Sequence, residues 1–284
     1  MIRSSIDKLD YMSLKKTIIN IIRQTRDTIV LIGKKKFKFK SSRLKKLNLT
    51  DLSRVFSSKS NDNFWEKSLS NYKKTEMPPD LSGGVNPGDI RAIHYLITEF
   101  KPIRILEIGT HIGNSLISMA LAASYCNNEF NITTVDIKDV NDQNIKPWTK
   151  SNSKYSPYEL LKQFKLEHKV TFKKSDSVSF LKSSSNKYDF IFLDGSHHAD
   201  VIYDELMYVS NIIDDNCIIL LHDYFPDGKP IWNESSKISG PYLAFEKIKN
   251  NNQNDIDILP LRNLPWKTKH NSNKTSLAIL TLQT

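Results

Sequence analysis

Two kinds of hydrophobic pattern alternate along the chain from residue 87 onward. Short continuous apolar runs, typical of buried strands, occupy residues 103–108, 132–136, 170–172, 188–194 and 217–221, and two later runs follow at 256–261 and 277–282. Between the first five runs, apolar side chains recur every three or four positions over residues 90–97, 115–124, 158–164 and 200–213, which predicts helices. Strands that alternate with helices predict a doubly wound α/β fold with a mostly parallel, seven-stranded, Rossmann-like sheet. We expect the run at 277–282 to pair inside this sheet.

The N-terminal part of the chain has a different pattern. Apolar residues of the stretch 14–33 fall at helical spacing (Leu14, Ile18, Ile21, Ile22, Ile29 and Ile32), which predicts an amphipathic helix. Arg23, Arg26 and Asp27 interrupt the stretch, so it is too polar for a membrane span. We therefore predict a basic helical arm and linker over residues 1–77, in which residues 53–77 form the connection, and a catalytic domain over residues 78–284.

The charge of the chain is concentrated in its first 50 residues. They hold 14 Lys and Arg against three Asp and Glu, whereas the other 234 residues hold 27 against 28. The near-neutral charge of the main body argues against nucleic-acid binding by it, because a body that bound nucleic acid would carry positive charge spread over its surface. For the arm three interpretations stay open: packing on its own core or on a second subunit in a homo-oligomer, peripheral contact with anionic lipid, and contact with nucleic acid. We expect the arm to be dispensable for chemistry.

Composition limits the class of protein further. The chain is 39% hydrophobic and 25% charged, which is ordinary for a globular protein and excludes wholesale disorder. Only two cysteines are present, Cys126 and Cys217, far apart in sequence, which excludes a disulfide framework and a thiolate zinc site. This cysteine usage predicts a cytoplasmic protein, with membrane association through the arm as an addition.

Polar residues follow the first three predicted strands, where open α/β sheets bind their ligands. Gly109 and Gly113 lie in a turn after the first strand, but without the GxGxxG spacing of a dinucleotide loop. Asp136 ends the second strand, where a carboxylate can accept hydrogen bonds from ribose hydroxyls. Residues 175–177 follow the third strand and can reach an adenine amino group or cap the next helix. Together these features indicate S-adenosylmethionine rather than NAD.

The fourth and fifth strands end in two clusters of acids and histidines. Asp194 precedes His197 by three residues, and His222 precedes Asp223 directly. Two carboxylates and an imidazole suit a divalent cation such as Mg²⁺ or Mn²⁺, so we predict Asp194, His222 and Asp223 as metal ligands. His197 has the chemistry of a general base near neutral pH.

These motifs resemble a known family. Residues 106–115, Asp136, residues 192–197 and residues 221–224 are similar to the class I S-adenosylmethionine-dependent methyltransferases. Within that class they resemble the metal-dependent branch of macrocin- and mycinamicin-type sugar O-methyltransferases and cephalosporin hydroxylase-like proteins. The resemblance covers residues 85–225 and leaves the basic arm unexplained.

The resemblance implies roles for particular residues. It places Glu107 and Gly109 at the methionine part of the cofactor, Asp136 at the ribose, and Asp176 with Ser177 at the adenine. Four further residues are expected to bind the cofactor: Thr110, Gly113, Ser115 and Asp194. It matches Asp194 and Asp223 to metal-binding acids and His197 to the base. One position departs from the pattern: His222 stands where the metal-dependent relatives carry an acid, which weakens the case for a Mg²⁺ site.

The predicted function is methyl transfer from S-adenosylmethionine to a hydroxyl of a small molecule or glycan, with a sugar as the expected acceptor. Four aromatic residues are candidates for stacking on the acceptor, with ordinary packing as the alternative: Trp148, Tyr155, Tyr224 and Trp266. Two alternatives belong to other classes. One is an RNA methyltransferase that holds its substrate with the arm, and the other is a non-catalytic binding module that keeps the cofactor fold.

Overall fold

The computed structural model describes residues 2–72, 84–126, 129–232, 238–252 and 255–283, with side chains from residue 17 onward. Its strands are β1 (Arg104–Ile108), β2 (Asn131–Asp136), β3 (Val170–Lys174), β4 (Tyr188–Leu193), β5 (Ile213–Leu221), β6 (Ile256–Pro260) and β7 (Ala278–Leu282). Its α-helices are α1 (Ile2–Ile32), α2 (Leu49–Phe56), α3 (Lys59–Tyr72), α4 (Pro87–Phe100), α5 (Asn114–Cys126), α6 (Pro157–Gln163), α7 (Ser177–Ser183), α8 (Ala199–Ile212) and α9 (Gly240–Asn251).

All seven strands form one sheet in the order β3-β2-β1-β4-β5-β7-β6. The first five strands pair in parallel, and β7 lies antiparallel between β5 and β6. The predicted mostly parallel, doubly wound sheet is confirmed, as is a partner for the last strand within it. β1 pairs with β2 on one side and with β4 on the other, so the strand order reverses there. Loops leaving these strands in opposite directions open a crevice at their carboxyl ends.

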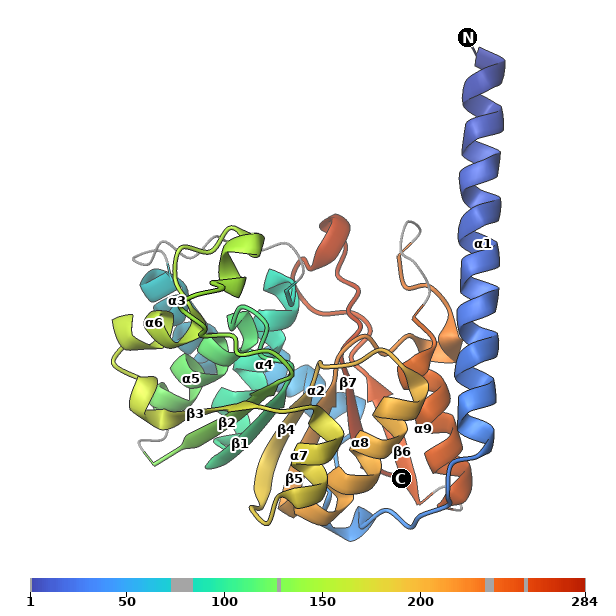
Figure 1. Ribbon diagram of the computed structural model, residues 1–284. Helices are drawn as coiled ribbons and strands as arrows, with labels where there is room; N and C mark the ends of the chain where they lie inside the picture. The colour runs from blue at the N-terminus through green and yellow to red at the C-terminus, as the bar shows by residue number, and fades with distance from the viewer. Residues whose placement is uncertain (1, 73–83, 127–128, 233–237, 253–254, 284) are drawn as a thin grey trace.

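Helices cover both faces of the sheet (Figure 1). Alternate residues of β4 point to opposite faces, as the pleat requires. Phe190 and Phe192 pack in the cluster formed with α4 and α5, whereas Ile191 and Leu193 pack in the cluster formed with α8 and α9. Burial on both faces explains why the strands read as continuous apolar runs rather than alternating ones.

The segment after α1 is part of the core, not a linker. Phe39, Leu44 and Leu47 are at most 4% exposed, and the Lys45 amide donates to the Cys217 carbonyl of β5 at 2.9 Å. α2 and α3 then contribute further core residues, Leu52, Val55, Phe56 and Trp65. The expectation of a connection over residues 53–77 is wrong for residues 53–72, and the proposed boundary at residue 77 lies outside the described residues.

α1 is a long helix whose C-terminal part packs on α8 and α9, while its N-terminal part extends beyond the body (Figure 1). Asp27 and Leu31 face the body and are buried, and Lys34 pairs with Asp204 of α8 at 2.5 Å. Ile18, Ile22, Ile29 and Ile32 are exposed on the other side of the helix. The predicted helix is therefore present, but its apolar stripe faces away from the core. Among the described helices, none combines the length and apolarity that a membrane crossing requires.

Because residues 34–47 complete the core, a truncation within them must reduce stability. We expect Leu44→Ala to lower the free energy of unfolding by about 2–5 kcal/mol, the usual cost of a cavity at a buried leucine. Leu49→Ala is the matched control, since Leu49 is 61% exposed and its loss should change stability by less than about 0.5 kcal/mol. Urea denaturation of both variants measures this difference. Equal effects would show that residues 34–47 do not pack on the sheet in solution.

Candidate functional site

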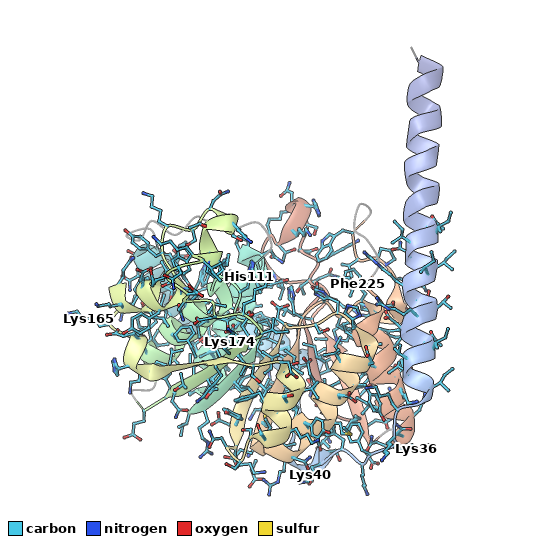
Figure 2. The ribbon with its side chains drawn as sticks, in the orientation of Figure 1. Lys36, Lys40, His111, Lys165, Lys174 and Phe225 are labelled. Atoms are coloured by element: carbon cyan, nitrogen blue, oxygen red, sulfur yellow. The ribbon has the colours of Figure 1, made fainter. Side chains whose placement is uncertain are left out.

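A cleft of about 720 Å³ lies at the carboxyl ends of β1, β2, β4 and β5, where the strand order reverses. Its walls come from the loops after these strands, from the start of α4 and from the chain around Trp232 and Lys269. His111, labelled in Figure 2, belongs to the loop after β1 that forms one wall. The cleft collects residues from segments more than 150 positions apart, as expected for a ligand site on an open α/β sheet.

Main-chain hydrogen bonds continue beyond the strand ends and fix the loops around the cleft. The Gly109 amide donates to the Val135 carbonyl at 2.8 Å, and the Asp194 amide donates to the Ile108 carbonyl at 2.9 Å. The His222 amide donates to the Leu193 carbonyl at 3.0 Å. The ladder therefore places the residues that leave β1, β4 and β5 side by side.

Gly109 is required by this close approach. Its φ is +97°, and a Cβ there would lie 2.4 Å from the Asp194 carbonyl oxygen. Any other residue would force the loops after β1 and β4 apart. Gly113 also has a positive φ, but it lies against Pro157 and outside the cleft lining.

Asp136 is held at the cleft by two backbone amides. Its Oδ2 accepts from the His111 amide and its Oδ1 from the Lys138 amide, each at 2.9 Å. The carboxylate is thus preorganised at the end of β2, in the cleft lining, where the sequence predicts a ribose contact.

Glu107 lies beneath the cleft rather than in its lining. It is fully buried, and its Oε1 accepts from the Ser115 hydroxyl at 2.6 Å and its Oε2 from the Thr134 hydroxyl at 2.5 Å. Burial raises the pKa of Glu107 to about 8. It is therefore largely protonated at neutral pH and ties the loop after β1 to β2. Its predicted cofactor contact stays a prediction.

The predicted adenine contacts also lie outside the cleft lining. Asp176 caps α7, because its Oδ1 accepts from the Ser179 amide at 2.9 Å, and Ser177 is the first residue of that helix. This is the capping alternative that the sequence left open. By contrast, Gly109, Thr110, Ser115, Asp136 and Asp194 of the predicted cofactor residues all line the cleft.

The acid and histidine clusters meet at the other end of the cleft. His197 Nε2 lies 2.5 Å from Asp223 Oδ2, and potential ligand atoms of Asp194, His197 and Asp223 all lie within 4.8 Å of one another. The hydrogen bond with Asp223 raises the pKa of His197, since it stabilises the imidazolium. The site thus contains a histidine whose ring is oriented by a carboxylate.

His222 lies deeper than His197, between carboxylates. Its Nδ1 is 2.9 Å from Asp194 Oδ1 and 3.6 Å from Asp223 Oδ2, and its Nε2 is 3.4 Å from Asp89 Oδ2. These approaches lack hydrogen-bond alignment and are charge contacts. Burial alone would lower the pKa of His222, but the charges of Asp194 and Asp223 outweigh it and raise the pKa well above its ordinary value. His222 is thus buried among three acids whose charges favour its protonated form.

The sequence missed several residues in or beside the cleft. Asp89 is fully buried at the start of α4 beside His222, and Asn114 begins α5 in the cleft lining with a buried Oδ1 that has no hydrogen-bond partner among the described residues. Trp232 and Lys269 line the cleft from irregular segments that no periodic pattern marks. Only the helix-start signals near Asp89 and Asn114 could have drawn attention to them.

The four aromatic residues predicted to stack on the acceptor do not line the cleft. Trp148 and Tyr224 are buried, at 3% and 4% exposed. Trp266 donates to the Gly88 carbonyl at 2.9 Å and packs against Arg91. Tyr155 is partly buried against the core. Their contacts match the alternative of ordinary packing, which the sequence left open.

Comparison with known proteins decides the class. A methyltransferase domain family matches residues 106–224, which include the ends of β1, β2, β4 and β5. The chain carries a methyltransferase domain. The predicted S-adenosylmethionine-dependent methyltransferase is thereby confirmed at the level of domain and fold. The comparison with curated proteins finds no match.

Solved structures share the fold at low sequence identity. The O-methyltransferase TomG from Streptomyces achromogenes, in complex with SAM, matches 86% of this methyltransferase chain and 99% of its own, at 15% identity and a TM-score of 0.51. The cofactor-bound protein Rv0187 from MTB matches 84% of this chain and 99% of its own, at 15% identity and a TM-score of 0.51. The O-methyltransferase from Bacillus cereus in complex with SAH matches 82% of this chain and 95% of its own, at 15% identity and a TM-score of 0.50. These similarities establish the fold of the O-methyltransferases.

Glu107 generates a pH prediction for this methyltransferase. Its pKa is raised from 4.5 to about 8 on folding, so the folded state binds a proton that the unfolded state releases between these values. Stability should therefore fall as pH rises through this window, by at most about 1.4 kcal/mol per pH unit. Glu107→Gln removes the titration and should flatten the profile. Thermal or urea unfolding across this range measures both proteins, and identical profiles would contradict a buried, protonated Glu107.

Proposed function

We propose that this protein transfers a methyl group from S-adenosylmethionine to a hydroxyl of a small molecule or glycan, with a sugar as the acceptor. The observation that carries the proposal is the His197–Asp223 pair, 2.5 Å apart, in the wall of the same cleft that holds Asp136 at its other end. The proposed base and the carboxylate proposed to bind the ribose thus line the same cleft, as methyl transfer to a hydroxyl requires.

The cleft suits the cofactor in size and charge. Asp136, Asp194 and Asp223 line it, and S-adenosylmethionine carries a sulfonium and an ammonium against one carboxylate. The unpartnered Asn114 Oδ1 offers a further acceptor toward such a ligand. The cofactor supplies an activated methyl group. We assign Asp136 to the ribose hydroxyls, and Gly109, Thr110 and Ser115 to the wall beside the methionine end.

His197 acts as the base in this proposal. Asp223 accepts from Nε2–H, which fixes the ring and leaves Nδ1 as the proton acceptor. The acceptor oxygen forms a bond to the methyl carbon as the sulfur–carbon bond breaks, and the hydroxyl proton passes to His197 Nδ1. The products are the methyl ether and neutral S-adenosylhomocysteine.

A divalent cation is part of the proposal, because potential ligand atoms of Asp194 and Asp223 lie within 4.8 Å of each other and of one in His197. Asp194 and Asp223 supply carboxylates, and His222 Nδ1 faces both of them. When bound, Mg²⁺ or Mn²⁺ would lower the pKa of the acceptor hydroxyl. The proton on His222 competes for the same two carboxylates. Its imidazolium is therefore the alternative source of positive charge at this place.

The remaining predictions concern partners. A small-molecule acceptor is consistent with the fold, and the near-neutral body argues against RNA as the substrate. Lipid contact through the arm and pairing of two copies remain predictions, as does a cytoplasmic location.

Turnover on a panel of sugars tests the proposal. We expect His197→Ala to lower the rate by about 10²–10⁴-fold, as for a lost general base, with S-adenosylhomocysteine binding retained. Excess chelator should suppress turnover, and Mg²⁺ or Mn²⁺ should restore it. Asp223→Ala should lower both the rate and its recovery by added metal, because Asp223 contacts His197 and is also a proposed metal ligand. His168→Ala is the matched control, since His168 is exposed in the turn before β3 and lines neither the cleft nor the cavity that adjoins it at His197. Full turnover in chelator would contradict the metal site and favour His222 as the built-in cation. Full turnover of His197→Ala would contradict the base.

A further inference from the structure

A second cavity, of about 340 Å³, adjoins the cleft. The two share His197 and Ile238 in their walls, so the proposed base lies between them. The far wall of this second cavity is α1, which contributes Arg23, Arg26 and Asp27. The basic arm, which the resemblance to methyltransferases leaves unexplained, thus reaches the site of chemistry.

The packing of α1 places both arginines at this wall and holds the side chain of Arg26. Arg26 Nη2 donates to Asp27 Oδ1 at 2.7 Å, and Asp27 Oδ2 accepts from the Ser239 hydroxyl at 2.9 Å. Asp27 is 2% exposed, so this contact anchors α1 beside the cleft. Arg26 remains 45% exposed, and Arg23 is exposed one turn earlier on the helix. Two guanidinium groups against one carboxylate leave this wall positively charged.

The charges of the two cavities are opposite. The cleft contains Asp136, Asp194 and Asp223 against Lys269, so its carboxylates outnumber its lysine and arginine side chains, which favours a cationic cofactor over an anionic group. The second cavity offers Arg23 and Arg26, and guanidinium groups match the oxygens of phosphates and carboxylates in geometry and charge. An acceptor that carries an anion would therefore be oriented, with its charged end on α1 and a hydroxyl at His197.

We propose that the cavity between α1 and His197 binds a phosphate or carboxylate group of the methyl acceptor, so that the substrate is an anionic sugar or a similar polyhydroxylated anion. This inference rests on the proposed methyl transfer at His197. It assigns the C-terminal part of α1 to substrate binding, with Arg23 as the principal contact because Arg26 also anchors Asp27.

Calorimetry with defined probes tests the anion site. Glucose 6-phosphate is titrated into the full chain, with and without saturating S-adenosylhomocysteine, and glucose serves as the neutral comparison. We expect glucose 6-phosphate to bind, glucose to bind at least about 10-fold more weakly, and Arg23→Gln to weaken glucose 6-phosphate binding by about 5–10-fold, in the range of a lost charged hydrogen bond. Added salt should weaken wild-type binding more than that of the variant.

Arg54→Gln is the matched control, because it removes the same charge from a side chain that is 76% exposed on α2. It should leave glucose 6-phosphate binding unchanged, and neither variant should change S-adenosylhomocysteine affinity or thermal unfolding. Absent binding of glucose 6-phosphate, or equal binding by Arg23→Gln and wild type, would overturn the inference. Arg23-dependent binding to vesicles of anionic lipid without binding of the sugar phosphate would also overturn it and assign the arginines to a lipid headgroup. Failure of S-adenosylhomocysteine to bind would instead count against the proposed function. The two failures can be told apart because glucose 6-phosphate is also titrated without S-adenosylhomocysteine.

Discussion

The close approach of the loops after β1 and β4 is the constraint on which the site depends. Only a glycine fits at position 109, because a Cβ would lie 2.4 Å from the Asp194 carbonyl oxygen. The amide of Asp194 in turn donates to the Ile108 carbonyl, and the amide of His222 donates to Leu193. These main-chain hydrogen bonds extend the pairing of the strands into the loops that follow them. Side chains that follow three different strands are thereby fixed in one row before any ligand binds.

Charge is distributed unevenly around that row. Acids line the cleft and surround the buried His222, whereas arginines of α1 line the adjoining cavity. His197 lies at the boundary between the two. In the proposed reaction, this division places the cationic cofactor and the anionic part of the acceptor in different spaces, with the transferred group between them. The proposal also gives the basic arm a role in binding the acceptor, since α1 is anchored to the body through Asp27 and Ser239.

The sequence predicted the parts of the structure that follow local rules. Buried strands such as residues 188–193 are continuous apolar runs, and strand-end residues such as Asp136, Asp194 and Asp223 are found together because parallel strands end at one edge. The predictions failed where burial is decided by distant partners. The polar stretch around Trp65 is a core helix because α4 packs on it, and Phe39 is buried beneath a basic run whose lysines remain outside. Trp232 and Arg23 reach the site through tertiary packing that no spacing reveals.

Calorimetric titration with S-adenosylhomocysteine tests most directly the claim that this cleft is the cofactor site. The account predicts binding in the micromolar range, about −8 kcal/mol, and a loss of at least about 1–2 kcal/mol in Asp136→Ala, because a charged hydrogen-bond acceptor for the ribose is removed. Asp215→Ala removes the same charge from a side chain that is 79% exposed at the opposite end of β5, and it should bind like the wild type. Unchanged affinity in a folded Asp136→Ala protein would contradict the account.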